Sequence, residues 1–198
     1  KEKRRIMMCH RRGVQRHLLA HRRSDGKERH YLAKNPSASP KVQALLDTFP
    51  DARFVYLARS PLSMIPSMIS CLEFTWQVLG DPPQPYAARD YVLNMAKHWY
   101  TYPLVQLDQL PQERYAIVSF ERLTQDADQV VPALYDKFGF EMSSDYAAIL
   151  NAEAEEARGY KSRHHYDLAE MGLSRDALVD RFATVFERFG FDTQPQST

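Results

Sequence analysis

Two short apolar runs early in the chain, Tyr31–Ala33 and Phe54–Ala58, enclose a segment whose apolar residues recur with helical spacing. These residues stand at i, i+3, i+4 and i+7, and are Val42, Leu45, Leu46 and Phe49. A strand, a helix and a second strand in this order predict a parallel pair, because the connection is long enough for a crossover. The second run is continuous rather than alternating, which predicts a strand covered on both faces.

The rest of the chain alternates between helical and extended patterns. Apolar positions predict further helices over 1–23, 62–79, 86–110, 128–138, 144–158 and 174–189, and a third strand over 114–120. Ser60 and Pro61 suit a helix start, and Gly139 and Gly190 suit helix ends. We therefore expect one α/β domain over residues 1–198, built on a parallel sheet flanked by helices.

A cation follows each of the first two predicted strands. Lys34 comes directly after the first run and Arg59 directly after the second. Ligands of open α/β sheets bind at the carboxyl ends of the strands, and an arginine beside a helix start favours an anion such as phosphate. The alternative is that both cations simply end strands in solvent.

A set of motifs in this region resembles the core of the sulfotransferases that use 3′-phosphoadenosine-5′-phosphosulfate (PAPS). The set is Lys34-Asn35-Pro36, then Phe49-Pro50-Asp51-Ala52-Arg53, then an R-x-P-x5-S pattern from Arg59 to Ser67. The resemblance implies a P-loop-NTPase-like sulfotransferase fold. It also implies that Arg59 and Ser67 bind the 3′-phosphate of the nucleotide, and that Lys34 lies near the transferred sulfonate as the catalytic lysine. The reaction implied is sulfuryl transfer from PAPS to a hydroxyl or amine of a small-molecule or carbohydrate acceptor, without a metal.

A second cationic stretch, 159–172 (GYKSRHHYDLAEMG), is similar to a Tyr-x-Ser-x-His-x-Tyr segment of the same family. In the family this segment returns to the nucleotide edge, so Lys161 or Arg163 is a further candidate for the 3′-phosphate. A solvated basic loop is the alternative interpretation. His164 and His165 are adjacent, and adjacent histidines are a poor basis for a metal site, so no metal is expected.

Two features depart from the family pattern. The family places a first strand and a Gly/Ser/Thr-rich phosphosulfate loop before the region seen here, whereas this sequence begins at Lys1 and has no cluster of glycines. The expectation is therefore the C-terminal part of a sulfotransferase domain, lacking the first strand and that loop. Many members also carry a histidine shortly after the catalytic lysine, but residues 35–39 contain none. The general base is therefore unassigned.

The charge distribution offers a rival function. Residues 1–30 hold eleven Lys or Arg against three Asp or Glu, although the whole chain carries a net charge of only +1. The rival is a non-catalytic nucleic-acid or anion-binding module that uses this basic helix. We favour an amphipathic helix that packs on the sheet, because no aromatic residue lies among the charges to stack on bases. Specific nucleic-acid binding is therefore not expected.

The cysteines and the hydropathy bear on the compartment. Cys9 and Cys71 are the only two cysteines, too few for a disulfide framework. No run reaches the length of a membrane span, and no secretory signal is visible. These features predict a cytoplasmic protein.

Overall fold

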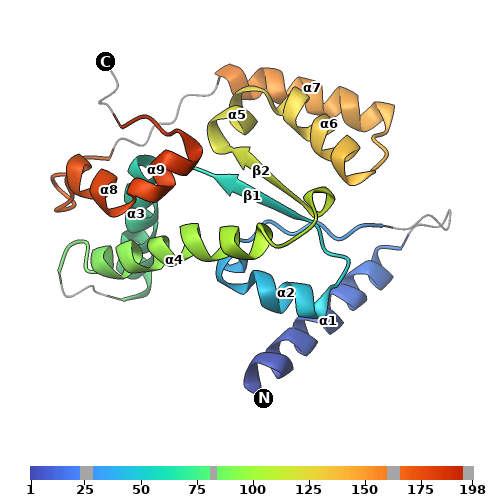
Figure 1. Ribbon diagram of the computed structural model, residues 1–198, viewed down its shortest axis with the longest axis horizontal. Helices are drawn as coiled ribbons and strands as arrows, with labels where there is room; N and C mark the ends of the chain where they lie inside the picture. Colours follow the sequence, from blue (N-terminus) through green and yellow to red (C-terminus); the bar gives the residue numbers. More distant parts are fainter. Residues whose placement is uncertain (23–28, 81–83, 160–165, 194–198) are drawn as a thin grey trace.

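The computed structural model describes residues 1–22, 29–80, 84–159 and 166–193. Its centre is a parallel pair of strands, β1 (Phe54–Ala58) and β2 (Tyr115–Ser119), as Figure 1 shows. The register runs from Phe54 opposite Tyr115 to Ala58 opposite Ser119, so both strands end at one edge of the sheet. The predicted parallel sheet is therefore confirmed for these two strands.

Helices surround the pair. The bounds are α1 (Glu2–Ala20), the 3-10 helix η1 (Pro36–Lys41), α2 (Val42–Thr48), α3 (Pro61–Leu79), α4 (Arg89–Leu107), the 3-10 turn η2 (Gln112–Arg114), α5 (Phe120–Gln125), α6 (Ala127–Phe138), α7 (Ser144–Gly159), α8 (Arg175–Arg181) and α9 (Ala183–Phe189). The crossover from β1 to β2 passes through α3 and α4. Figure 1 shows α4, α3, α8 and α9 on one side of the strands and α5, α6 and α7 on the other.

The core lies mainly between α3, α4, α8 and α9. Its buried members include Ile65, Ile69, Val92, Tyr100, Leu178 and Phe182. A smaller cluster joins α2, the end of α4 and the strands, with Val42, Leu107 and Tyr115 buried. Burial of these apolar side chains fixes α3 and α4 against the sheet, and therefore fixes the loop between β1 and α3.

Helix boundaries follow the predicted signals closely. Gly139 and Gly190 end α6 and α9 in the left-handed conformation, with φ of 68° and 62°. Ser174 caps α8 by accepting a hydrogen bond from the Ala177 amide at 3.1 Å. α3 continues through Pro66, which is buried, so the proline does not end the helix.

The predicted first strand, Tyr31–Ala33, is wrong. Residues 29–35 are irregular, and the Leu32 side chain is 93% exposed. A strand exists only where a neighbour pairs its N–H and C=O groups, and β1 pairs with β2 instead. Lys34 therefore does not end a strand.

The prediction that β1 is covered on both faces is also wrong. Burial alternates along the strand, and Val55 and Leu57 are 46% and 42% exposed while Phe54 and Tyr56 pack on the smaller cluster. This alternation is typical of a strand with one covered face.

Two predicted helices differ in detail. α1 packs on α2 rather than on the sheet. The helix predicted over 174–189 is broken at Phe182, which has φ −114° and ψ 21° and is buried between α8 and α9. An apolar face with helical spacing continues across both halves, so the sequence pattern could not reveal the break.

Candidate functional site

Arg59 lies where β1 passes into α3, and three contacts fix it. Its Nε donates to Ser63 Oγ at 3.1 Å, and its guanidinium carbon lies 4.6 Å from the centre of the Phe120 ring. Its carbonyl oxygen accepts a hydrogen bond of 2.6 Å from the Tyr100 hydroxyl. Within the described part of the chain, its two Nη atoms have no hydrogen-bond or ion-pair partner. The side chain is therefore held at one nitrogen and one face, and two donor atoms remain for an anion.

The register of the sheet explains the contact with Phe120. Ala58 pairs with Ser119, so the residues that follow them, Arg59 and Phe120, emerge side by side. Phe120 begins α5, and its half-buried ring supports the guanidinium by a cation–π contact. A contact between residues 61 positions apart in sequence thus follows from strand pairing.

Tyr100 fixes the backbone at this corner. It is buried in α4, with only 4% of its surface exposed. Burial, and then the Tyr56 hydroxyl, raise the pKa of Tyr100 far above its ordinary value of 10.0, although the Arg59 guanidinium acts in the opposite direction. The phenol therefore stays protonated and continues to donate to the Arg59 carbonyl oxygen.

Ser67, the predicted partner of Arg59, lies one helical turn beyond Ser63 on α3. Residues four apart share a helix face, so Ser63 and Ser67 lie on the same side of α3. Ser67 is half-buried, and its side chain forms no hydrogen bond with the described residues. The structure thus places Ser63 in direct contact with Arg59 and leaves the Ser67 hydroxyl without a partner among those residues.

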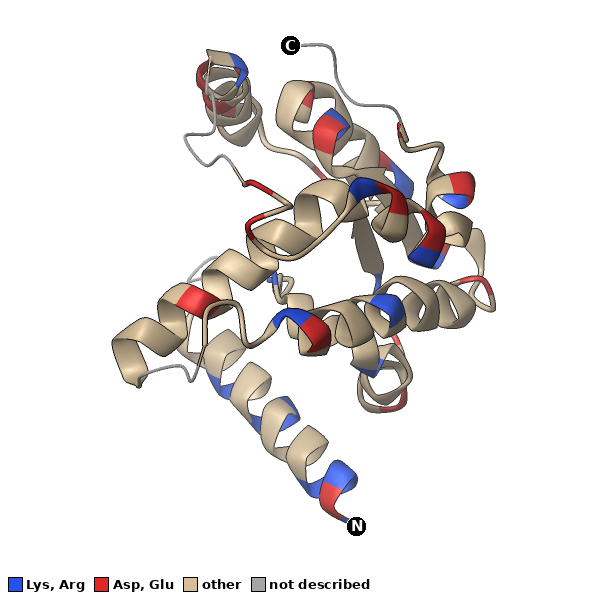
Figure 2. Ribbon diagram, turned by 90° about the vertical axis from the view of Figure 1, so that its left-hand side faces the viewer, with Lys and Arg blue, Asp and Glu red and all other residues tan. Residues whose placement is uncertain are grey.

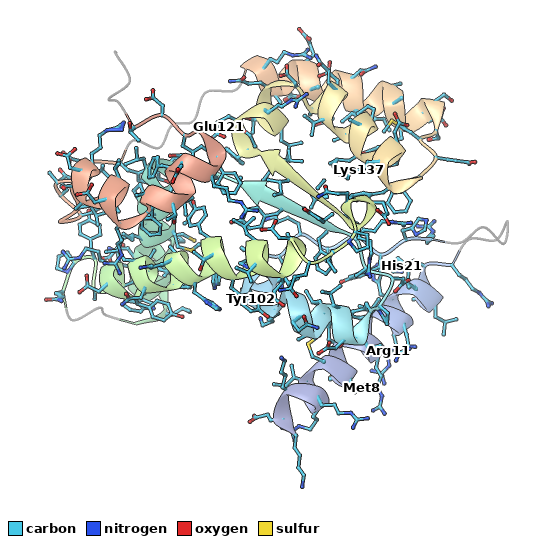
Figure 3. All side chains as sticks on the ribbon, in the orientation of Figure 1. Met8, Arg11, His21, Tyr102, Glu121 and Lys137 are labelled. Atoms are coloured by element: carbon cyan, nitrogen blue, oxygen red, sulfur yellow. The ribbon has the colours of Figure 1, made fainter. Side chains whose placement is uncertain are left out.

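The end of β2 contributes one carboxylate to the same edge. Ser119 caps α5 by accepting from the Arg122 amide at 3.2 Å, and its hydroxyl donates to Glu121 Oε2 at 2.8 Å. Figure 3 shows Glu121 beside the ends of both strands. Glu121 forms no ion pair with the described residues.

Lys34 forms no hydrogen bond or ion pair with Arg59 or with the other described residues of this corner. Lys34 is exposed, in the irregular segment before η1, where Asn35 Oδ1 accepts from the Ser37 amide at 2.9 Å. Lys161 and Arg163, together with His164 and His165, fall outside the described residues. Within residues 1–22, 29–80, 84–159 and 166–193, no group of three His, Cys, Asp or Glu side chains could hold a metal ion.

Sequence reasoning missed Ser63, Phe120 and Tyr100. Ser63 could have been found, because it stands four residues after Arg59 at a helix start. The contacts of Phe120 and Tyr100 depend on strand register and on the packing of α4, which no local pattern reveals. His98 is exposed, and its ring stacks on Tyr102 at 5.1 Å between ring centres (Figure 3 labels Tyr102).

Comparison with known proteins identifies the family. The sulfotransferase family model matches residues 2–144. This chain belongs to the sulfotransferase family. Its motifs around Lys34, Arg59 and Ser67 all lie inside the matched region.

Individual relatives are distant. Omega-hydroxy-beta-dihydromenaquinone-9 sulfotransferase Stf3 from Mycobacterium bovis and that from Mycobacterium tuberculosis are each 23% identical over 163 residues. The match covers 81% of this chain and 41% of the relatives, so the sulfotransferase chain described here spans about two fifths of their length.

Solved structures show the same fold. Sulfotransferase STF9 from Mycobacterium avium superposes with a TM-score of 0.66 at 21% identity, covering 83% of this chain and 42% of that one. Sulfotransferase STF1 from Mycobacterium tuberculosis gives a TM-score of 0.60 at 22% identity, covering 81% and 40%. The predicted α/β sulfotransferase fold is thereby confirmed.

Proposed function

We propose that this chain belongs to an enzyme that transfers a sulfuryl group from PAPS, and that Arg59 and Ser67 bind the 3′-phosphate of the nucleotide. The observation that carries the proposal is the state of the Arg59 side chain. It stands at the carboxyl edge of a parallel sheet, held by Ser63 and Phe120, with both Nη atoms unpaired among the described residues. A guanidinium fixed in this way fits a phosphate, because little conformational freedom is lost on binding.

The reaction needs further groups from the protein. The acceptor oxygen or nitrogen attacks sulfur, the bond from sulfur to the phosphate oxygen of the donor breaks, and the acceptor proton passes to a base. In this proposal Lys34 neutralises charge on the transferred group, as a cation does in phosphoryl transfer. Its exposed position before η1 leaves its ammonium group accessible. No base is assigned, and Lys161 and Arg163 stay secondary candidates for the 3′-phosphate.

The acceptor is proposed as a hydroxyl of a small molecule. Support comes from the name of the Stf3 relatives, which describes sulfation of an omega-hydroxylated dihydromenaquinone. An amine and a carbohydrate hydroxyl remain the other candidates. No described helix is both long and apolar enough to cross a bilayer. The cytoplasmic location stays a prediction.

Calorimetric titration with 3′,5′-adenosine bisphosphate tests the nucleotide site. Arg59→Ala should weaken binding roughly 10- to 100-fold, the usual cost of losing hydrogen bonds to a charged group. Adenosine 5′-monophosphate lacks the 3′-phosphate, so the unsubstituted chain should bind it more weakly than it binds the bisphosphate. The unsubstituted chain and Arg59→Ala should bind the monophosphate with about equal affinity.

The matched control is Arg53→Ala. Arg53 precedes β1, so it lies at the opposite edge, and its guanidinium also lies over a phenylalanine ring, 4.9 Å from the centre of Phe140. The control should retain full affinity. Equal losses in both variants, or steeply salt-dependent binding of polynucleotides without any preference for the 3′-phosphate, would contradict the proposed site and favour the anion-binding module.

A further inference from the structure

The helix α1 has two opposite faces, and the described residues cover one of them. Met7 and Val14 are buried against the protein, and the ring of His10 packs edge-on against Phe49, 5.7 Å away, just after α2. The contacts of α1 are mainly with α2, and Figure 1 shows it projecting from the rest of the molecule. Its outer face is therefore not covered by the described residues.

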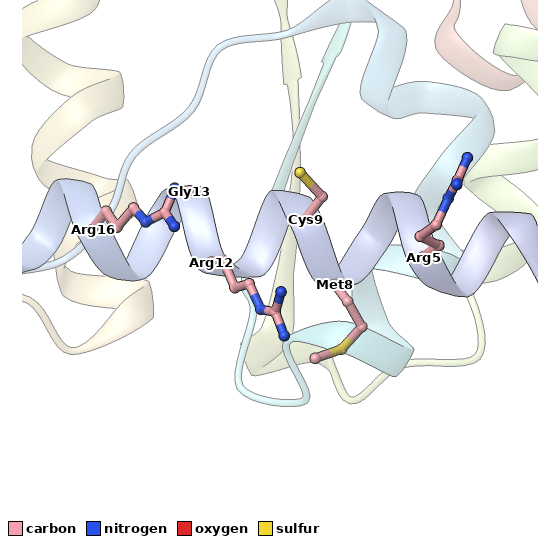
Figure 4. Close-up of a pocket in the computed structure, with 6 residues that line it drawn as sticks. All are labelled: Arg5, Met8, Cys9, Arg12, Gly13 and Arg16. Carbon is pink, nitrogen blue, oxygen red and sulfur yellow. The ribbon is translucent and has the colours of Figure 1, made fainter.

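A line of arginines runs along this outer face. Arg5, Arg12 and Arg16 stand at i, i+7 and i+11, which places them on one side of the helix, opposite Met7 and Val14. Together with Met8, Cys9 and Gly13 these side chains line a surface pocket, and Figure 4 shows them along α1. All three arginines are exposed, and none forms an ion pair with a described residue.

The charge on α1 is unbalanced. Residues 1–22 contain eight Lys or Arg and a single acidic residue, Glu2. Figure 2 shows this as blue segments along α1 with one red segment near its start. Elsewhere arginines find carboxylates, as Arg158 does with Asp128 and Arg188 with Asp108. A cationic face with a single carboxylate attracts an extended anionic partner.

Apolar side chains accompany the arginines. Met8 and Leu19 are eleven residues apart, about three helical turns, so both lie beside the arginine row. Their side chains are 40% and 66% exposed. Ile6, on the other flank, is 57% exposed. A helix with arginines and exposed aliphatic residues on one face matches the interface of a lipid bilayer. There, long cationic side chains reach the headgroups and aliphatic side chains enter the acyl boundary.

We propose that the outer face of α1 docks on a membrane surface that carries anionic lipid headgroups. A polynucleotide is the weaker candidate, because α1 contains no Phe, Tyr or Trp to stack on bases, whereas its exposed Met8 and Leu19 have no use on a phosphate backbone. The partner surface should therefore be anionic at its outside and apolar just below it. A phospholipid bilayer with anionic headgroups has this combination.

Vesicle flotation with the full chain tests the proposal. The chain should float with vesicles of phosphatidylcholine mixed with phosphatidylglycerol, and not with phosphatidylcholine alone, and added salt should weaken the association. Substituting Arg5, Arg12 and Arg16 together by Gln should lower the partition coefficient by about fivefold per residue, or on the order of 100-fold in total. The same three positions changed to Lys should retain binding, because headgroup attraction needs only the charge.

Two further variants test whether binding depends on this surface or only on the total charge of the protein. Changing Lys41, Lys97 and Lys137 to Gln removes the same charge from exposed sites elsewhere and should leave binding within about twofold. Replacing Met8 and Leu19 by Ser should weaken binding even where the charge is unchanged. Circular dichroism tests whether each variant keeps its helices.

Three outcomes would overturn the proposal. They are equal binding to neutral and anionic vesicles, equal losses in the two glutamine triples, and binding to an oligonucleotide without binding to anionic vesicles. The last would assign the surface to nucleic acid. None of these results depends on nucleotide binding at Arg59, so this proposal and the proposed transfer reaction can fail separately.

Discussion

Arg59 and Lys34 have almost the same local sequence, yet the structure treats them differently. Each follows an alanine that ends a short apolar run, and each is followed by a polar residue and then a proline. Ala58 is 2% exposed at the end of β1, while Ala33 is exposed in an irregular segment. The difference lies in pairing: all five residues of β1 have partners in β2, and residues 31–33 have none among the described strands. An identical local pattern becomes a strand end only when a second strand fixes it.

The largest expected difference between the Arg59 and Lys34 regions concerns the packing of the alanine that precedes each cation. Ala58→Leu should lower the free energy of unfolding by about 1–3 kcal/mol, because a larger side chain enters a filled space beside Ser119. Ala33→Leu should change it by less than about 0.5 kcal/mol, since the site is exposed. Urea denaturation of both variants measures the two values, with an unchanged slope showing that the native state is retained.

Equal destabilisation by these two substitutions would contradict the comparison. It would mean that Ala33 is packed in solution as tightly as Ala58. A strand over residues 31–33 would then regain support, and Lys34 would return to a strand end.

Much of the helical frame could be predicted from the sequence, because caps and apolar faces act locally. The αL glycines at 139 and 190 act within one turn, and both have the predicted role. Strand pairing acts over long separations, and three residues such as 31–33 carry no information about whether a partner exists. The same holds for the open face of β1, whose Val55 and Leu57 look like interior residues in sequence.

The candidate site divides in the same way. Arg59 was found because a helix start and a strand end adjoin in sequence, and its position at the carboxyl edge is confirmed. Ser63 was not predicted, because the resemblance to the family pointed to Ser67 as the serine of the site. Phe120 and Tyr100 reach Arg59 from β2 and α4, at separations of 61 and 41 residues, and only the assembled fold brings them there.

A second difference between Arg59 and Lys34 is the hydrogen bond from the Tyr100 hydroxyl to the Arg59 carbonyl oxygen. No described side chain forms such a bond with the backbone of Lys34. Tyr100→Phe should cost about 1–3 kcal/mol, since the Arg59 carbonyl oxygen loses its donor in a buried place. Tyr91→Phe is the control, because Tyr91 is 66% exposed and should tolerate the change. Urea denaturation near neutral pH measures both.

The pH dependence of Tyr100→Phe sharpens this prediction. The pKa of Tyr100 is raised in the folded state above the value of 10.0 expected when unfolded. Its contribution is therefore complete below pH 10 and is lost as the pH rises further, by up to about 1.4 kcal/mol per pH unit. The gap between the original chain and Tyr100→Phe should narrow above pH 10. A gap that stays constant there would show that the phenol does not remain protonated in the fold.

The smallest expected effect concerns the two arginines that flank β1, each resting on a phenylalanine. Phe120→Leu keeps an apolar side chain under Arg59 but removes the ring, and the cation–π contact is worth about 0.5–1 kcal/mol at a partly exposed site. Under the proposed function, affinity for 3′,5′-adenosine bisphosphate should fall by about two- to fivefold. Phe140→Leu removes the equivalent support from Arg53 at the other edge and should leave affinity unchanged, measured by calorimetry at a temperature where both variants are folded. If Phe140→Leu weakened binding as much as Phe120→Leu, the effect would come from general loosening of the strand pair, and Phe120 would have no particular part in positioning Arg59.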